Sequence, residues 1–307
     1  MTASVPADAT TLTPSMSYGV DERVRHGESQ TRIALRRLMR QPATVAGVIV
    51  LLLMTFGALA APMLTPYEPD KLSPREARIP PTWEHPLGTD HFGRDVLTRI
   101  LYGGRVSLRI GLIAVGIGAT IGVTLGAIAG YRGGWIDEAV SRFIDIMLAF
   151  PGILLAIAVV AVLGPDLSNL MIAVGVGTVP GFARLVRGQT LAAREFDYVT
   201  AARALGCSHA KILARHILPN VLAPIVVFAT LSIAGAILAG ASLNYLGLGA
   251  KPPTAEWGLM LAEARDEIRR SWWLPTFPGL AIMLTVIAIN AVGDGLRDAF
   301  DPRLGRR

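Results

Sequence analysis

The sequence predicts an all-α polytopic membrane protein with about six transmembrane helices. Two observations carry this prediction. Of the 307 residues, 52% are hydrophobic and only 17% are charged, whereas soluble globular domains carry about a quarter charged residues. The apolar residues are also gathered into long uncharged runs, as expected where a bilayer excludes charge.

The first apolar run, Ala43–Leu64, contains no charged residue. As a helix it would be about 33 Å long, enough to cross a hydrocarbon core of about 30 Å. Arginines gather just before it: Arg32, Arg36, Arg37 and Arg40. The positive-inside rule then places a tail of residues 1–42 in the cytoplasm, a first transmembrane helix at 43–65 and an external segment at 66–104.

The rest of the chain, 105–300, predicts a core of five further helices, followed by a cytoplasmic C-terminus at 301–307. The apolar runs lie at about 106–130, 143–163, 168–186, 221–248 and 274–296. The net charge of +6 is carried mainly by arginines in the tails and in the loop after the fourth run. This distribution indicates cytoplasmic loops of a membrane protein and not a nucleic-acid-binding face.

Small residues recur along two of the runs. Glycines stand four residues apart on the second run and on the fourth: Gly118, Gly122, Gly126 and Gly130, then Gly177 and Gly181. Glycine ridges let two helix backbones approach closely in lipid. We expect ordinary helix packing here, with a sliding interface used in transport as the alternative.

The basic segment between the fourth and fifth runs predicts two short helices joined at a glycine. Residues 201–205 favour a helix, and Gly206 is placed to end it, as glycine does just past a helix C-terminus. Ser208 can cap a second short helix. Pro219 and Asn220 are expected to stop that helix and begin the next span.

Some apolar residues of these two helices would be exposed to water unless something covers them: Ala201, Ala202, Leu205, Ile212 and Leu213. Two explanations are open. A groove in a soluble partner could receive them, or they could pack on the inner ends of the protein's own helices.

This segment resembles the coupling motif of ABC importer permeases. In that motif, Glu-Ala-Ala is followed by a glycine and then by an apolar–x–Leu-Pro-like ending, and this segment has its glycine and its ending at the same distances. Thr200 stands where that family more often has glutamate. The resemblance implies a coupling loop at 191–219 that sits in a cleft of a separate ATPase subunit. Its implied coupling residues are Thr200, Ala201, Ala202, Leu205, Gly206, Ile217, Leu218 and Pro219.

A second stretch narrows the resemblance. Residues 85–99 (His-Pro-Leu-Gly-Thr-Asp-His-Phe-Gly-Arg-Asp-Val-Leu-Thr-Arg) are similar to the external segment of the dipeptide, oligopeptide and nickel branch of these permeases. Shorter matches follow at 144–151, 244–249 and 301–304. The external motif residues implied are Gly88, Thr89, Asp90, Gly93, Arg94 and Asp95.

Without the resemblance, the chemistry of the residues predicts that the external motif contributes little to stability. Gly88 and Gly93 are turn points, and Arg94 with Asp95 and Arg99 is expected to form ion pairs at the surface. Such pairs are worth about 1 kcal/mol or less, so we expect register or docking features and not stabilisers.

The resemblance implies a type I ABC importer permease fold and a C-type subunit in the bacterial inner membrane, with both termini cytoplasmic. It implies as partners a B-type permease subunit, two ATP-binding subunits, an extracytoplasmic solute-binding protein and the lipid bilayer, with no nucleic acid. ATP and magnesium would belong to the ATPase subunits. The implied cargo is a di- or oligopeptide, with nickel or another small solute as the alternative.

Four polar or helix-breaking residues are candidates for lining a pathway: Asp145, Pro151, Asn244 and Asn290. Asp145, like Arg109, lies near a helix end, where its charge can reach the interface. Pro151 should kink the third helix, because proline removes a backbone bond and clashes with the preceding turn. The asparagines could hydrogen-bond between helices.

The sequence lacks the motifs of an enzyme. It contains no G-x-x-x-x-G-K-[ST] phosphate loop, no metal-ligand spacing among its histidines and no catalytic constellation of serine, cysteine or carboxylates. We therefore expect no catalysis, metal or cofactor in this chain. A membrane-embedded enzyme and a self-sufficient secondary transporter are the rival classes. The latter commonly needs inverted repeats and charges within the membrane, which the runs do not show.

Overall fold

The computed structural model describes residues 38–39 and 41–300. The predicted cytoplasmic tail at 1–42, apart from its last residues, and the predicted C-terminus at 301–307 lie outside this part of the chain. Apart from an isolated bridge between Thr89 and Asp95, the described residues form helices, turns and loops.

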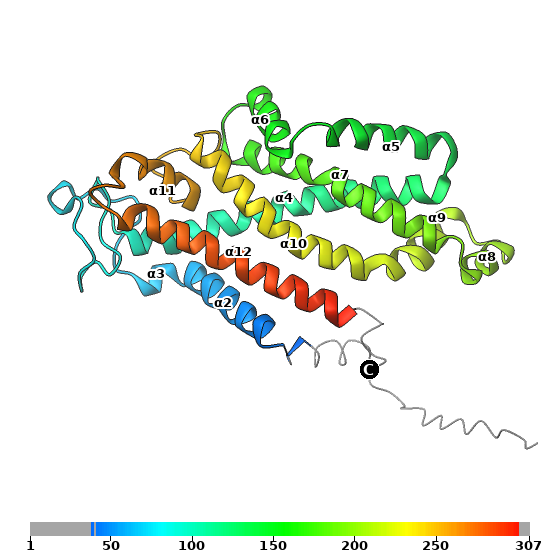
Figure 1. Cartoon of the computed structure of the whole chain (residues 1–307), viewed down its shortest axis with the longest axis horizontal. Helices are drawn as coiled ribbons and strands as arrows, with labels where there is room; N and C mark the ends of the chain where they lie inside the picture. Colours follow the sequence, from blue (N-terminus) through cyan, green and yellow to red (C-terminus); the bar gives the residue numbers. More distant parts are fainter. Residues whose placement is uncertain (1–37, 40, 301–307) are drawn as a thin grey trace, which may run out of the picture.

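The long helices lie side by side along the longest axis of the molecule (Figure 1). They are α2 (Pro42–Leu59), α4 (Val96–Arg132), α7 (Leu167–Ala193), α10 (Leu218–Tyr245) and α12 (Trp273–Phe300). Within the described part of the chain, five helices are long and apolar enough to cross a membrane, or up to six if the bent pair α5 (Gly134–Leu148) and α6 (Gly152–Leu163) forms one span. The predicted number of spans is confirmed to that extent.

The shorter elements gather at the two ends of the bundle. At one end lie α3 (Ala61–Leu64), the 3-10 turn η1 (Pro74–Glu76), α11 (Trp257–Glu263) and η3 (Arg265–Glu267) (Figure 1). At the other end lie α8 (Asp197–Ala204), α9 (His209–Ile212) and the π-helical turn η2 (Leu213–Ile217). The predicted external segment and the predicted coupling loop are therefore at opposite ends.

The prediction for the third span was wrong in its shape. Pro151 does not kink a continuous helix, because α5 and α6 are separate helices that meet at 92°. The helix α5 ends at Leu148, and Pro151 precedes α6 with φ −54° and ψ 130°. A residue before proline is disfavoured in the helical conformation, which makes a break here the low-energy solution.

Two predicted helix boundaries are also corrected. The second span begins at Val96 and not near 105, because the Asp95 side chain caps it by accepting a hydrogen bond from the Thr98 backbone N–H. Pro219 and Asn220 do not stop the second short helix, since α9, η2 and α10 follow one another without a gap. Pro219 is tolerated within the first residues of α10, where a missing N–H costs little.

The glycine ridge of α4 packs against α7, and these two helices make the most extensive contact in the described structure. A Cβ atom at Gly122 would lie 2.7 Å from the Val179 carbonyl oxygen, and one at Gly130 would lie 2.7 Å from that of Arg187. The ridge therefore serves close packing, as expected. On α7, Gly177 makes no such approach, since its nearest neighbour would be 3.8 Å away.

The main hydrophobic core lies between α4, α7 and α10. Its fully buried side chains include Ile110, Leu170, Phe182, Val186 and Leu243. The phenyl ring of Phe182 meets that of Phe228 edge to face, with centroids 4.8 Å apart, and so joins α7 to α10.

Candidate functional site

The turn at Gly206 is a helix–glycine–helix structure, as the sequence predicts. Gly206 has φ +75°, a left-handed conformation that L side chains rarely adopt. The Cys207 N–H donates to the carbonyl oxygen of Ala202 at 3.1 Å and closes the end of α8. The Ser208 side chain accepts a bond from the Lys211 N–H at 3.4 Å and caps α9.

The apolar residues of this turn divide between the two explanations that the sequence leaves open. Ala202 and Ile212 are buried in the protein's own core. Leu205 is 84% exposed and Ala201 is exposed beside it. The turn therefore has a base anchored within the chain and an apolar tip without cover from the described residues.

The other predicted coupling residues lie on the same structure but face different surroundings. Ile217 is fully buried, whereas Leu218 is half-buried. Thr200 and Pro219 are exposed. The structure thus brings the predicted residues together on one end of the bundle, with Ile217 as part of the anchor.

Two residues that sequence reasoning missed attach this turn to α4. The hydroxyl of Tyr131 lies 2.9 Å from Nδ1 of His209, within hydrogen-bonding distance. Tyr131 is buried at the end of α4, so contacts run from α9 to α4 and, through the glycine ridge, from α4 to α7. The residues are far apart in sequence, and no local pattern indicates the pairing.

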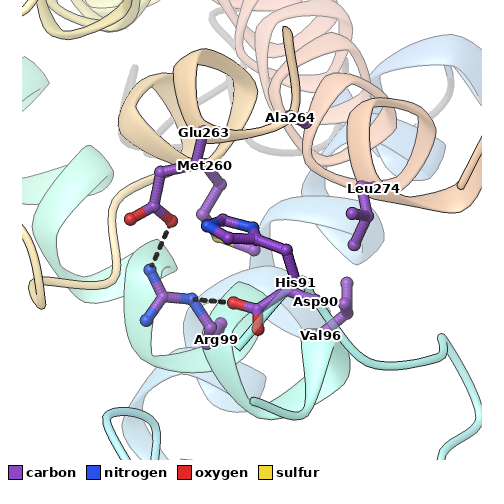
Figure 2. A pocket seen from close by; sticks show the side chains of 8 residues that line it. All are labelled: Asp90, His91, Val96, Arg99, Met260, Glu263, Ala264 and Leu274. Carbon is purple, nitrogen blue, oxygen red and sulfur yellow. Dashed lines mark hydrogen bonds and ion pairs between the residues drawn. The ribbon is translucent and has the colours of Figure 1, made fainter. Parts of the chain in front are cut away.

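At the opposite end, the expected surface ion pairs of the 85–99 stretch are wrong. Arg94 is 2% exposed and Arg99 is 1% exposed. Both side chains reach the carboxylate of Glu263 on α11, with N–O distances of 2.8 Å from Arg94 and 3.2 Å from Arg99. Figure 2 shows the Arg99 guanidinium between the carboxylates of Glu263 and Asp90. We call these four residues (Asp90, Arg94, Arg99 and Glu263) the ionic clamp.

The ionic clamp joins three segments that are distant in sequence. Arg99 also donates to the carbonyl oxygens of Pro69 and Pro253, both at 3.1 Å. A cavity of about 10 Å³ beside Arg99, lined also by His91, has room for a single water molecule. Because buried charges are stable only when they are paired and hydrogen-bonded, this end of the protein is an ordered structure and not a loose loop.

The remaining motif residues of the 85–99 stretch are structural as well. Gly88 and Gly93 have φ +78° and +79°, which confirms them as turn points, and a side chain on Gly93 would collide with the backbone of Ser73. The Thr89 carbonyl oxygen accepts a bond from Nε1 of Trp273. Asp95 lies 3.0 Å from Nδ1 of His85.

Another buried carboxylate, Glu256, caps α11. It accepts hydrogen bonds from the Leu259 N–H and from the hydroxyl of Ser107, each at 2.8 Å. Burial raises the pKa of Glu256, while these bonds favour its ionised form. At the surface nearby, the hydrogen bond from Arg78 lowers the pKa of Glu267. Glu256 thus holds the start of α11, and Glu267 joins η3 to Arg78 in the loop before α4.

The four predicted pathway residues occupy different environments. Asn244 has no exposed surface, and its Oδ1 accepts a bond from the Ala250 N–H at 2.7 Å. Asp145 is exposed and pairs with Arg184 at 2.9 Å. Pro151 and Asn290 are exposed. Asn244 therefore stabilises the turn after α10.

A hollow of about 370 Å³ lies between α6, α7 and α10, next to the break between α5 and α6. Its walls include Gly152, Gly177, Gly181 and Phe228. The absence of side chains on these glycines leaves the space open. Sequence reasoning predicted Gly177 and Gly181 to form a packing ridge, and the structure places them in this wall.

Comparison with known proteins identifies the family. The model of the family described as binding-protein-dependent transport system inner membrane component matches residues 122–306, which is more than half of the chain. The chain belongs to this family. A second model, described as the N-terminal TM domain of oligopeptide transport permease C, matches residues 29–81.

Relatives within the family are similar over nearly the whole chain. The dipeptide transport system permease protein DppC of Alkalihalophilus pseudofirmus is 46% identical, covering 95% of this chain and 96% of that protein. The di/tripeptide transport system permease protein DppC of Pseudomonas aeruginosa is also 46% identical, over 85% of this chain and 88% of that one. The glutathione transport system permease protein GsiD of Pectobacterium atrosepticum is 47% identical, over 88% and 90%.

A solved structure supports the fold. The inward-facing MetNI methionine ABC transporter contains a chain that superimposes with a TM-score of 0.54 at 19% identity, covering 66% of this chain and 97% of that one. The protein therefore has the type I importer permease fold, and it is a multi-pass membrane permease subunit of the ABC importer class.

Proposed function

We propose that this chain is the C-type subunit of a peptide importer and that the Gly206 turn is the surface through which separate ATPase subunits drive it. The turn carries the proposal because its base is buried while its tip, Leu205, is 84% exposed. An apolar tip on a rigid base is the form expected of a helix that docks into a groove of a partner.

The same proposal assigns the other subunits. A B-type permease would complete the pathway, two ATPase subunits would bind ATP and magnesium, and a solute-binding protein would deliver the cargo outside the cell. The end of the bundle that carries α8 and α9 then faces the cytoplasm, and the end with the ionic clamp faces outward. Both termini are cytoplasmic, and the membrane is the bacterial inner membrane.

A di- or oligopeptide is the proposed cargo. The names of relatives at 46–47% identity support peptides over nickel, which shares the branch that the sequence resembles. The proposed pathway runs along the hollow between α6, α7 and α10, where the glycine walls leave room for solute. Asp145 and Pro151, near the break between α5 and α6, are proposed to contribute exposed surface to it, whereas Asn290 lies on α12, away from this hollow. Asn244 does not contribute, because it is buried.

Uptake of labelled dipeptides and of nickel, in a strain that lacks only this chain, tests the cargo. Peptide uptake should disappear and return with the gene. Loss of nickel uptake alone would assign the alternative cargo. ATP-independent uptake by this chain alone in liposomes would contradict the importer assignment altogether.

The coupling role is tested at Gly206. Gly206→Val should separate ATP hydrolysis from uptake, because a β-branched residue disfavours the left-handed conformation by roughly 1–2 kcal/mol and turns Leu205 away. Gly206→Asn is the matched control, since asparagine adopts that conformation readily and a Cβ here meets no atom within 4 Å. Normal coupling in Gly206→Val would refute the role.

A further inference from the structure

A basic cavity of about 390 Å³ lies beside the Gly206 turn, between the end of α4 and the helices α8 and α9. Three arginines line it: Arg132 from α4, Arg194 from the end of α7 and Arg203 from α8. Glu195 is the carboxylate in its lining, and Arg194 already donates to Glu195 at 2.9 Å. The cavity wall therefore carries more positive than negative charge.

The walls of this basic cavity are held in place by bonds across elements. Arg194 donates to the Gly130 carbonyl oxygen at 3.0 Å, which ties α7 to the end of α4. The contact between Tyr131 and His209 ties α4 to α9. The cavity is thus a formed feature of the fold and not a gap between flexible side chains.

Two of the cations remain available for a ligand. Arg132 and Arg203 are exposed, and neither makes an ion pair with any residue that the structure describes. Thr200 lines the same cavity and adds a hydroxyl group. Two guanidinium groups and a hydroxyl can together hold one carboxylate through charge-assisted hydrogen bonds.

The surroundings of the cavity favour a protein ligand. At the same end of the bundle, Leu205 is 84% exposed, and the exposed rings of Phe196 and Tyr198 stack with centroids 5.8 Å apart. Aromatic and aliphatic side chains beside arginine are the composition of protein–protein contact surfaces. Figure 1 shows α8 at the tip of the bundle, past the neighbouring ends of the long helices, where a soluble partner has access.

We propose that the basic cavity of Arg132, Arg194 and Arg203 receives an acidic side chain of the ATPase subunit. This inference rests on the proposed coupling function and adds the charge of the contact. Leu205 would supply apolar burial, and the carboxylate would set the orientation of α8, because charged contacts fix register and specificity across an interface.

Charge changes in the assembled four-subunit transporter test this proposal. Arg203→Glu should reduce ATP-driven peptide uptake at least tenfold, and fewer ATPase subunits should stay bound to the permease during purification. Arg142→Glu, the same change at an exposed arginine of α5 outside the cavity, should leave uptake close to that of the unaltered transporter. Equal losses in both variants would overturn the proposal.

A second charge change in the cavity tests the same contact. Arg132→Glu should also reduce uptake, because a carboxylate at this lining position would repel the partner's acid. Unchanged or increased uptake in Arg132→Glu would show that the partner offers no acid to this cavity, and would overturn the proposal.

A membrane ligand is the competing outcome. The variants are compared in vesicles of neutral phosphatidylcholine and in vesicles that contain anionic phosphatidylglycerol. A loss in Arg203→Glu that appears only with the anionic lipid would assign the cavity to a headgroup and refute the acidic partner. Leu205→Asp distinguishes the coupling role of the Gly206 turn from the acidic contact in the basic cavity. If Leu205→Asp uncouples ATP hydrolysis from uptake while the cavity variants do not, only the acidic contact is refuted.

Discussion

Gly122 is the position where the close packing of α4 on α7 can be measured with a single methyl group. A Cβ atom there would lie 2.5 Å from Cβ of Phe182, 2.7 Å from the Val179 carbonyl oxygen and 3.0 Å from the Ala183 nitrogen. Ordinary contact begins at 3.4 Å, so the two helices would have to separate by about 0.9 Å. None of these three atoms is the free end of a flexible side chain, so the strain cannot be relieved locally.

The expected loss for Gly122→Ala follows from this geometry. Adding a methylene to a packed core costs about 1–3 kcal/mol, and helix association in lipid depends on such packing. Gly116→Ala is the matched control, because it lies on the same helix and its Cβ would meet no atom within 4 Å. That control should be unchanged or more stable by up to about 1 kcal/mol, from the helix propensity of alanine. Because both variants gain this propensity, they should differ by the packing cost of about 1–3 kcal/mol.

The measurement is the unfolding of the purified full-length chain in mixed micelles at increasing denaturing detergent, followed by tryptophan fluorescence. Gly122→Ala should unfold at a lower detergent fraction than Gly116→Ala. If the two variants unfold together, α4 and α7 are not in the close contact described.

Two further predictions concern the charged end. Glu263→Gln should lower the free energy of unfolding by about 3 kcal/mol, because it removes the carboxylate shared by the buried Arg94 and Arg99. Arg142→Gln, whose ion pair is exposed, should change that free energy by about 0.5 kcal/mol or less. Equal effects of the two variants in the same unfolding assay would contradict the burial of the ionic clamp. Arg78→Met should remove a pH-dependent stabilisation: the pKa of Glu267 is lowered by its bond to Arg78, so the contribution is present above the ordinary glutamate pKa and is lost as the pH falls through the lowered value. The stability difference between Arg78→Met and the unaltered chain should therefore vanish in acid, and a difference that grows in acid would refute the assigned direction.

Most of the helical architecture could be predicted because its causes are local. A long uncharged run is a helix in lipid, since a helix satisfies the backbone hydrogen bonds of the segment within the segment itself. Gly206 ends α8 because of its own conformational freedom, and Ser208 caps α9 through its own hydroxyl. Glycines four residues apart on α4 indicate a smooth face, whatever helix packs on it.

The errors arose where a partner distant in sequence decides the outcome. Arg94 and Arg99 look like surface residues because their local sequence is polar. Their partner in the folded protein, Glu263, lies on α11, far away in the sequence. The bend at Pro151 was predicted as a kink, since the sequence contains no information on the angle at which α6 folds back. Tyr131 and His209 carry no local signal of their contact.

The sequence by itself therefore determined the membrane class, the approximate positions of five long helices and the helix–glycine–helix turn, because hydropathy, capping and glycine conformation act within a few residues. Only the tertiary structure decided which apolar residues of that turn are covered and which are free. Ala202 and Ile212 are buried by helices from elsewhere in the chain, while Leu205 extends past them. Burial is a property of what packs on a residue, and for these residues that is set by the assembled bundle.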